Sequence, residues 1–336
     1  MSKKFSKEEI LKRINRLRLG ENSKGGEMQD WASGMGQRIG DIFQVAMDIV
    51  FEEFAKDNDM LSKGGGKVDI LNGDRKQIDG RLFKCPPDED GNKELLSGQL
   101  NNELSDKLKT KGLSKSGTKD EMVERLLQMK RTLDIIGESK WLKDQKHQND
   151  KGAWITNLPN DVCIKNPGIR GILALLGGPW EGTAAYNTMK VQRTEVVLIP
   201  FDIVIEFLQE IGLKYELDED KNLKAPKETY LKLCDLEEAE LNQHLHRPYT
   251  VWAEKLLKLP HGDDKKTIRE AMMEALSNIS KNQSKTEEVE SNGYVCTSQI
   301  TNEDLEVYQL MIPRSKRDAV RDAIESTCGE SSESDE

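Results

Sequence analysis

The sequence predicts a mainly α protein in which a small two-helix module is joined to a larger helical body. Two observations predict this class. Apolar residues recur at helical spacing in several segments, and some of these segments begin with a helix-capping signal. The chain of 336 residues is 36% apolar and 33% charged, so it can form a core and still leave long solvated stretches. Its length allows two or three domains.

Residues 1–55 are predicted to be an N-terminal helical segment with a basic arm. Ser6 and Glu9 form a capping box, and apolar residues follow at helical spacing until Gly20. The other face of this helix is rich in lysine and arginine, which is typical either of a solvated face or of an arm that contacts phosphates or an acidic partner. A second apolar stripe, wide enough for a core, covers residues 41–54.

Residues 56–96 are predicted to form a linker, because glycine, aspartate and lysine dominate the first part of this segment. Asn72 and Gly73 supply a turn signal, so a short hairpin within the linker is an open alternative. The run KGGGK at residues 63–67 lacks the spacing of a P-loop and the Ser or Thr that follows one.

Residues 97–131 show the pattern of helix, tight turn and helix. The first helix carries one apolar stripe of leucines at four-residue intervals, namely Leu100, Leu104 and Leu108. Gly112 follows, where helices commonly end in a residue that tolerates positive φ. Thr118 and Glu121 form a capping box that opens the second helix. The inward residues of that helix are Met122, Val123, Leu126 and Leu127.

The start of the second helix is predicted to bind phosphate. Free backbone N–H groups and two hydroxyl groups gather there, at the positive end of the helix dipole. Lysines surround these groups, and only Asp106 and Asp120 oppose them. The predicted nucleic-acid-binding residues are Lys107, Lys109, Lys111, Lys115, Ser116, Gly117, Thr118, Lys119 and Arg125.

This module resembles a SAP domain over about a tenth of the chain. The resemblance rests on Leu100, Glu103, Leu104, Leu108, Lys111, Gly112, Leu113, Ser116, Gly117, Thr118, Lys119, Met122, Glu124, Arg125 and Leu126. A SAP domain implies DNA binding, and in that family the module usually serves as an accessory tether and not as the catalytic centre.

The remaining segments are predicted to be a helical body at 132–281, a C-terminal helical segment at 282–322 and an acidic, disordered tail at 323–336 that suits a protein partner. His244 and His246 follow Cys234, but no fourth ligand accompanies them, so no metal site is predicted. No GxSxG, HExxH or paired acidic motif stands in a context that supports catalysis. The pattern therefore predicts no catalytic residues and no cofactor.

Composition also sets expectations about location. The cysteines are dispersed and odd in number, which favours reduced thiols in an intracellular compartment; they are Cys85, Cys163, Cys234, Cys296 and Cys328. The longest apolar run, residues 196–208, is too short to span a bilayer. We expect an intracellular protein without a membrane partner, nuclear if the cell is eukaryotic. A net charge of -10 excludes an overall basic surface, so nucleic-acid contact requires local basic patches.

Three functions fit these observations. The leading prediction is a non-enzymatic protein that binds DNA, or RNA, through the SAP-like module as a phosphate-gripping tether. The first alternative is a nucleocapsid or core protein that packages a genome as a homo-oligomer, with a location in a virion or ribonucleoprotein. The second alternative is a DNA-processing enzyme with an accessory SAP module.

Overall fold

A computed structural model gives the structure of this protein. It describes residues 7–19, 31–70, 74–86, 89–142, 148–163, 165–166, 168–190, 192, 194–213, 216–217, 223–224, 227–243, 249–261, 266–281, 285–291, 294–300 and 306–308. The chain falls into two compact units, Met1–Ile279 and Ser280–Glu336. No helix within the described ranges combines the length and apolar character needed to cross a membrane.

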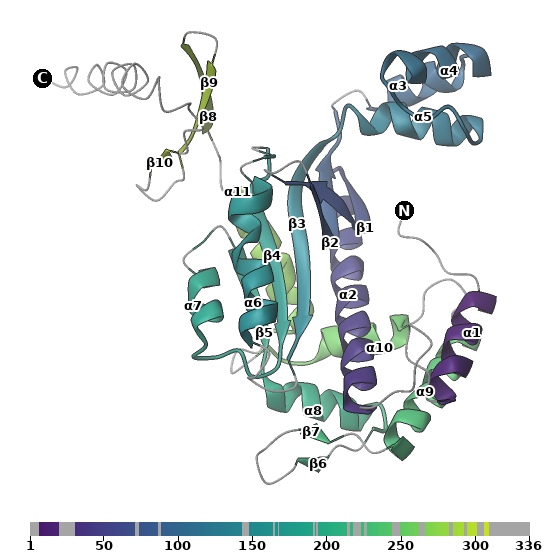
Figure 1. Cartoon of the computed structure of the whole chain (residues 1–336), viewed down its shortest axis with the longest axis vertical. Helices are drawn as coiled ribbons and strands as arrows, with labels where there is room; N and C mark the ends of the chain where they lie inside the picture. Colours follow the sequence, from purple (N-terminus) through teal and green to yellow (C-terminus); the bar gives the residue numbers. More distant parts are fainter. Residues whose placement is uncertain are drawn as a thin grey trace, which may run out of the picture. The chain divides into compact units, whose positions relative to one another are not determined.

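A five-stranded mixed sheet forms the centre of the first unit (Figure 1). Its strands, in spatial order, are β1 (Met60–Asp69), β2 (Arg75–Lys84), β3 (Thr132–Trp141), β4 (Gly171–Gly177) and β5 (Thr194–Ile199). The pairs β1–β2 and β2–β3 are antiparallel, whereas β3–β4 and β4–β5 are parallel. The protein is therefore an α/β protein, and the prediction of a mainly α fold with a helical body is wrong.

Strands β3 and β4 were missed because they lack the alternation of buried and exposed residues that marks a half-exposed strand. Strand β4, with the sequence GILALLG, is buried along its whole length, and most of β3 is buried as well. Strands in the middle of a parallel sheet are covered on both faces, so they form short continuous apolar runs that cannot be told from helix segments by periodicity. Strands β1 and β2 occupy the predicted linker and form a longer hairpin than the turn signal indicated.

Helices cover both faces of the sheet (Figure 1). On one face, α2 (Trp31–Asp57) shares its core with four later helices, which are α8 (Phe201–Glu210), α9 (Lys227–Gln243), α10 (Thr250–Lys258) and α11 (Ile268–Lys281). A second core holds residues from α6 (Gln148–Thr156), a π-helix (Pro159–Cys163) and α7 (Ala184–Lys190). The basic helix α1 (Lys7–Arg18) contacts α9, where Arg18 pairs with Asp235 and Glu238, at 2.7 Å in each case. Two short paired strands, β6 (Glu216–Leu217) and β7 (Leu223–Lys224), complete this unit.

Two facing glycines allow α2 to lie close against the sheet. Gly80 of β2 pairs with Gly137 of β3. A Cβ atom at Gly137 would lie 2.5 Å from the Met47 sulfur and 2.6 Å from the Phe51 ring, and one at Gly80 would lie 3.0 Å from the same ring. Any side chain at these positions would push α2 away from the sheet, so the glycines fix the distance between the two layers.

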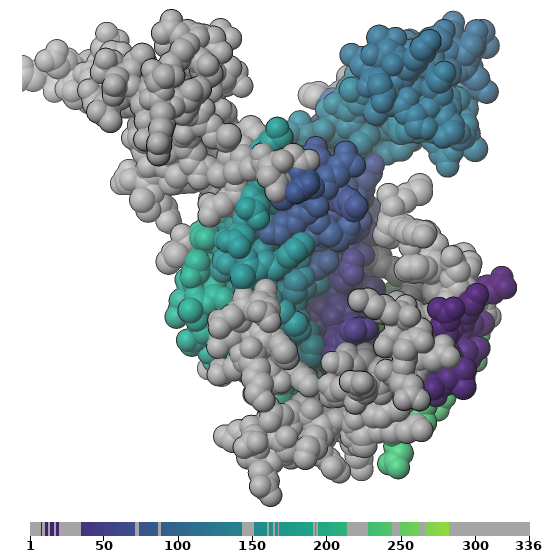
Figure 2. Space-filling view, viewed as in Figure 1, coloured from purple at the N-terminus to yellow at the C-terminus, as the bar shows by residue number. Residues whose placement is uncertain are grey.

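A helical domain is inserted between β2 and β3. It consists of α3 (Glu89–Ser97), α4 (Asn101–Thr110) and α5 (Lys119–Gln128), which form one cluster (Figure 2). These helices have a hydrophobic core of their own, made of Leu96, Leu104, Leu108, Met122, Val123 and Leu127. The insertion separates two neighbouring strands of the sheet in the sequence.

The second unit contains a three-stranded antiparallel sheet. Its strands are β8 (Lys285–Ser291), β9 (Tyr294–Ile300) and β10 (Glu306–Tyr308), with β9 in the middle. They lie where a C-terminal helical segment was predicted. The predicted tail at 323–336 and the pair His244 and His246 lie outside the described residues.

Candidate nucleic-acid interface and carboxylate–lysine site

The turn between α4 and α5 has the geometry that its sequence predicts. Gly112 has a φ of +67°, and the Leu113 N–H donates to the Leu108 carbonyl at 2.8 Å, which closes the end of α4. At the start of α5, the Glu121 N–H donates to Thr118 Oγ1 at 3.3 Å, while the Thr118 N–H donates to Glu121 Oε2 at 2.7 Å. The predicted signals for the end of α4 and for the start of α5 are both confirmed.

The predicted core residues differ in their burial. Leu104 and Leu108 are fully buried, and Met122, Val123 and Leu127 are nearly so. Leu126 is half-buried at the edge of this core. Leu100 stands at the N-cap of α4 and is 65% exposed, so the apolar stripe begins one turn later than expected.

Leu104→Ala should therefore destabilise the inserted domain by about 2–4 kcal/mol, because it removes a fully buried side chain from a small core. Leu100→Ala is the matched control and should change the free energy of unfolding by less than about 0.5 kcal/mol. Amide hydrogen exchange in the full chain measures both effects, and amides of the sheet report whether the rest of the protein stays folded. Equal protection of the α4 and α5 amides in the two variants would contradict this assignment of the core.

Most of the predicted phosphate-binding residues are on the surface. Lys107, Lys109, Lys111 and Lys115 are exposed, as are Ser116, Gly117 and Thr118, whereas Lys119 is half-buried. These lysines form no ion pair with a described residue, so their charges are not neutralised within the described part of the chain. Their assignment to phosphate contacts stays a prediction.

Arg125, another predicted phosphate-binding residue, stabilises the turn between α4 and α5. Its guanidinium donates to the Ser114 and Ser116 carbonyls and, at 3.0 Å, to the Glu121 carbonyl. It therefore holds the turn in shape. Gly117 has a φ of +110°, and a Cβ atom there would lie 2.1 Å from Glu121 Oε2 and 2.9 Å from Arg125. A larger residue at this position would break the cap, so lysine variants test phosphate binding more cleanly than Gly117 variants do.

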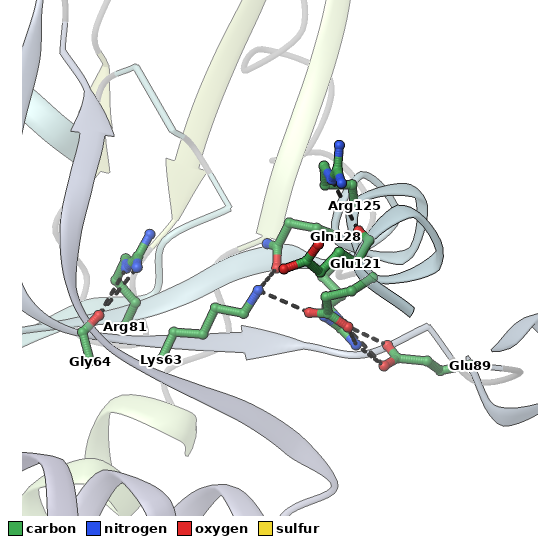
Figure 3. A network of polar contacts seen from close by, with 9 residues as sticks. Lys63, Gly64, Arg81, Glu89, Glu121, Arg125 and Gln128 are labelled. Carbon is green, nitrogen blue, oxygen red and sulfur yellow. Dashed lines mark hydrogen bonds and ion pairs between the residues drawn. The ribbon is translucent and has the colours of Figure 1, made fainter. Parts of the chain in front are cut away.

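A network of charges attaches the inserted domain to the sheet (Figure 3). Arg131, just before β3, donates to both carboxylate oxygens of Glu89 at 3.0 Å and to Glu124 at 2.6 Å. Lys63 of β1 reaches Glu124 at 3.1 Å and also donates to Gln128. Burial opposes ionisation of Glu124, but hydrogen bonds from Arg131 and Lys63 outweigh burial and lower its pKa. The arginine and the lysine thus join α3 and α5 to two strands.

Two carboxylates and a lysine meet on β2 and β3, beside the glycine pair. Because Gly80 faces Gly137 in an antiparallel pair, the next residues, Asp79 and Glu138, are neighbours. The Asp79 N–H donates to Glu138 Oε2 at 3.3 Å, and Asp79 Oδ2 accepts from the Ser139 N–H at 2.9 Å. This carboxylate also accepts from the Ser139 hydroxyl, at 3.0 Å.

The Lys140 ammonium lies where three oxygens converge. It is 3.5 Å from Asp79 Oδ2 and 3.0 Å from the Ser139 carbonyl oxygen, and it donates to Glu138 Oε1. The Glu138 side chain is only 2% exposed, whereas Asp79 and Lys140 are 20% and 23% exposed. Glu138 thus forms the buried part of the cluster, and Asp79 and Lys140 form the part that solvent reaches. The cluster lies near the carboxyl end of β3, where α/β sheets commonly bind their ligands.

The cluster carries more negative charge than its lysine balances. Burial, and then the adjacent Asp79 carboxylate, raise the pKa of Glu138 to about 7, although Lys140 opposes this shift. Asp134, the other buried acid of β3, is different: Arg170 Nε meets its Oδ1 at 2.6 Å and a second guanidinium nitrogen meets its Oδ2. Asp134 therefore forms a closed structural pair, whereas Asp79 and Glu138 share one ammonium.

Sequence reasoning missed this cluster because the inserted domain places its two carboxylates 59 residues apart. The signal was present in each strand. Asp79 follows Ile78, and Glu138 and Lys140 interrupt the run LDIIGESKW. Charged residues are rarely buried unless they are paired or bind a ligand, so acids inside apolar runs indicate a site once the runs are taken as strands.

The oxygens of this cluster suit a hard divalent cation. Among the described residues, no group of three or more His, Cys, Asp or Glu side chains has metal-site geometry. Mg²⁺ does not need such a group, because proteins commonly hold it through one or two carboxylates, with water and substrate phosphate completing the coordination. Asp79, Glu138 and the Ser139 carbonyl would be the ligands, in place of the Lys140 ammonium.

Fold and geometry together define an α/β protein with an inserted helical domain whose helix-turn-helix surface is basic. Residues 101–128, which include α4, the turn and α5, match the family model of the SAP domain. The resemblance is thus confirmed for this part of the chain, and a SAP domain indicates binding to DNA or another nucleic acid. No curated protein and no solved structure matches the chain.

Proposed function

We propose that this protein is a nuclease that hydrolyses phosphodiester bonds with a divalent cation, and that its SAP domain tethers it to DNA. The observation that carries the proposal is the convergence of Asp79, Glu138 and the Ser139 carbonyl oxygen on the Lys140 ammonium, a position that a divalent cation could take in its place. A cation-binding site that shares a chain with a nucleic-acid-binding domain favours chemistry on the nucleic acid. This proposal takes the place of the leading prediction of a non-enzymatic tether.

Each residue of the cluster has a role in this account. Asp79 and Glu138 supply the charge that holds the cation, and hydrogen bonds from Ser139 orient the Asp79 carboxylate. A bound divalent cation supplies Lewis-acid polarisation of the phosphodiester and lowers the pKa of a coordinated water. The Lys140 ammonium, released from the three oxygens, is placed to stabilise negative charge on the phosphate. In the reaction, water forms a bond to phosphorus, and the leaving alcohol oxygen departs and takes up a proton.

The SAP domain supplies affinity in this proposal. Its exposed lysines and the N–H groups at the start of α5 contact phosphates without reading sequence. The network of Arg131, just before β3, and Lys63 of β1 attaches this domain to the sheet that carries the carboxylates. Binding through the SAP domain then raises the local concentration of DNA at the sheet.

A cleavage assay tests the proposed function. The full chain is incubated with supercoiled plasmid and with linear duplex DNA in Mg²⁺, Mn²⁺, Ca²⁺ or EDTA. We expect cleavage with Mg²⁺ or Mn²⁺ and none with EDTA. Intact DNA under every condition, with binding retained in a gel-shift assay, would refute the nuclease and restore the non-enzymatic tether.

The raised pKa of Glu138 predicts a specific effect on stability. The folded state holds this proton more tightly than the unfolded state does, so the resulting stabilisation is complete below about pH 4.5 and is lost as the pH rises through about 7. Glutamine at position 138 stays uncharged at every pH, so Glu138→Gln does not lose this stabilisation as the pH rises. Without metal, this variant should gain stability relative to wild type between pH 5 and 8, by roughly 1.4 kcal/mol per unit of pKa difference. Urea unfolding in EDTA measures the gain, and parallel pH profiles of the two proteins would contradict the burial argument.

A further inference from the structure

A groove lies between the SAP domain and the β1–β2 hairpin. It has a volume of about 670 Å³, and its lining comes from β1, β2, the end of α5, the start of β3 with Arg131 before it, and residues 165, 166 and 168. We name it the hairpin groove. Its lining includes Lys63 and Lys67, the two ends of the run KGGGK in β1. A Cβ atom at Gly66 would lie 2.3 Å from an Arg81 guanidinium nitrogen, so the absence of side chains in this run makes room for Arg81.

The lining of the hairpin groove is strongly basic in a chain of net charge -10. Among the described residues, its cations are Lys63, Lys67, Arg81, Arg131 and Lys165, and its one acid is Asp69. Arg75 pairs with Asp69 at 3.0 Å, and Glu124 and Glu89 of the inserted helical domain neutralise Lys63 and Arg131. Lys67, Arg81 and Lys165 form no ion pair with a described residue. Three positive charges are therefore left unbalanced along one groove.

Arg81 is the most informative of these three cations. It is half-buried, and its guanidinium donates to the Gly64 carbonyl at 3.2 Å (Figure 3). The guanidinium also lies 5.8 Å from the Phe83 ring centroid. Burial lowers the pKa of Arg81, and no carboxylate of a described residue offsets this cost. The side chain is thus held in one orientation without a counter-ion. A fixed guanidinium suits an anion with several oxygens, such as a phosphate.

The position of the hairpin groove favours a nucleic acid as the anion that binds there. Arg81 follows Asp79 by two residues on β2, so the Cα atoms of the two residues are roughly 7 Å apart. Gly80, between them, faces α2, whereas the Arg81 guanidinium lies beside Gly66 of β1. The groove is also bounded by Gln128 of the SAP domain. The groove therefore extends from the SAP domain to Arg81, which is two residues from Asp79 on β2.

We propose that the hairpin groove binds the phosphate backbone of a nucleic acid through Lys67, Arg81 and Lys165, and so carries the strand from the SAP domain toward the carboxylate–lysine site. This inference rests on the proposed nucleic-acid function. It means that the sheet of the protein, and not the SAP domain alone, contributes to the affinity for nucleic acid.

Fluorescence anisotropy with a labelled 30-base-pair duplex in EDTA tests the groove independently of cleavage. Lys67→Ala/Lys165→Ala should weaken binding by about tenfold and reduce the salt slope by about two. Arg81→Gln should weaken it by about tenfold, and Arg81→Lys should restore only part of the loss, because lysine lacks the fixed fork. Lys255→Ala/Lys258→Ala on α10 is the control and should bind as wild type does. Thermal unfolding checks that every variant is folded.

The outcomes separate this inference from the proposed function. Wild-type affinity and salt slope in the groove variants, with loss only in Lys115→Ala/Lys119→Ala of the SAP domain, would refute the groove and keep the tether. No binding by the wild type would refute the nucleic-acid function itself. Oligoglutamate that binds as tightly as DNA, with the same dependence on Arg81, would overturn nucleic acid in favour of an acidic protein partner.

Discussion

Replacing Glu138 with glutamine should reduce divalent-dependent DNA cleavage by about 10³-fold or more. The side chain keeps its shape, but it loses the negative charge that holds the cation at the buried floor of the site. Asp79→Asn should have a similar effect, because it removes the second charged oxygen ligand. Affinity for DNA in EDTA should stay within about twofold of wild type, since neither residue lies in the SAP domain or the hairpin groove.

Two further variants make this result specific. Glu195→Gln removes a half-buried carboxylate from β5 of the same sheet and should cleave at the wild-type rate. Lys140→Met should abolish cleavage while leaving the carboxylates free to bind metal, because Lys140 acts on the phosphate in this account. Residual cleavage at the wild-type rate by purified Glu138→Gln would mean that the activity comes from elsewhere in the protein or from a contaminant.

Excision of the SAP domain should lower the affinity for long duplex DNA by about 10²-fold while leaving cleavage at saturating DNA within about twofold of wild type. The strands on either side of the insertion are paired, with Lys84 opposite Thr132. Residues 85–131 can therefore be replaced by a four-residue turn containing Asn-Gly, which closes a β2–β3 hairpin. Asp79 and Glu138 lie beyond the Gly80–Gly137 pair and keep their neighbours.

The dependence of the cleavage rate on DNA concentration measures this separation. A raised KM with an unchanged kcat is the expected result. Loss of kcat in the excised variant, with the sheet shown to be folded by hydrogen exchange, would mean that the SAP domain belongs to the reacting site. An unchanged KM would mean that the SAP domain contributes nothing to binding.

The SAP domain could be predicted from the sequence in detail because its signals are local. Gly112, Thr118 and Glu121 act within one turn of the chain, and the apolar residues of α4 and α5 follow the helical period. The exposure of Leu100 and the use of Arg125 to hold the turn were not predicted, because each depends on how the helices meet.

The sheet could not be predicted in the same way. Burial on both faces removed the alternation from β3 and β4, and the glycines of β1 resembled a linker until Arg81 was seen to fill the space beside them. The carboxylate–lysine site depends on the β2–β3 register across an inserted domain. A site of that kind becomes visible only when the pairing of the strands is known.

Direct binding of Mn²⁺ to the metal-free full chain, without DNA, tests the central claim that Asp79 and Glu138 hold a divalent cation. Isothermal titration calorimetry at pH 8 should detect a bound ion in the wild type. Binding should weaken at least about tenfold in Glu138→Gln and in Asp79→Asn, and also in the wild type at pH 6, where Glu138 holds its proton. Equal binding by the wild type and both variants, or none by any of them at pH 8, would contradict the account.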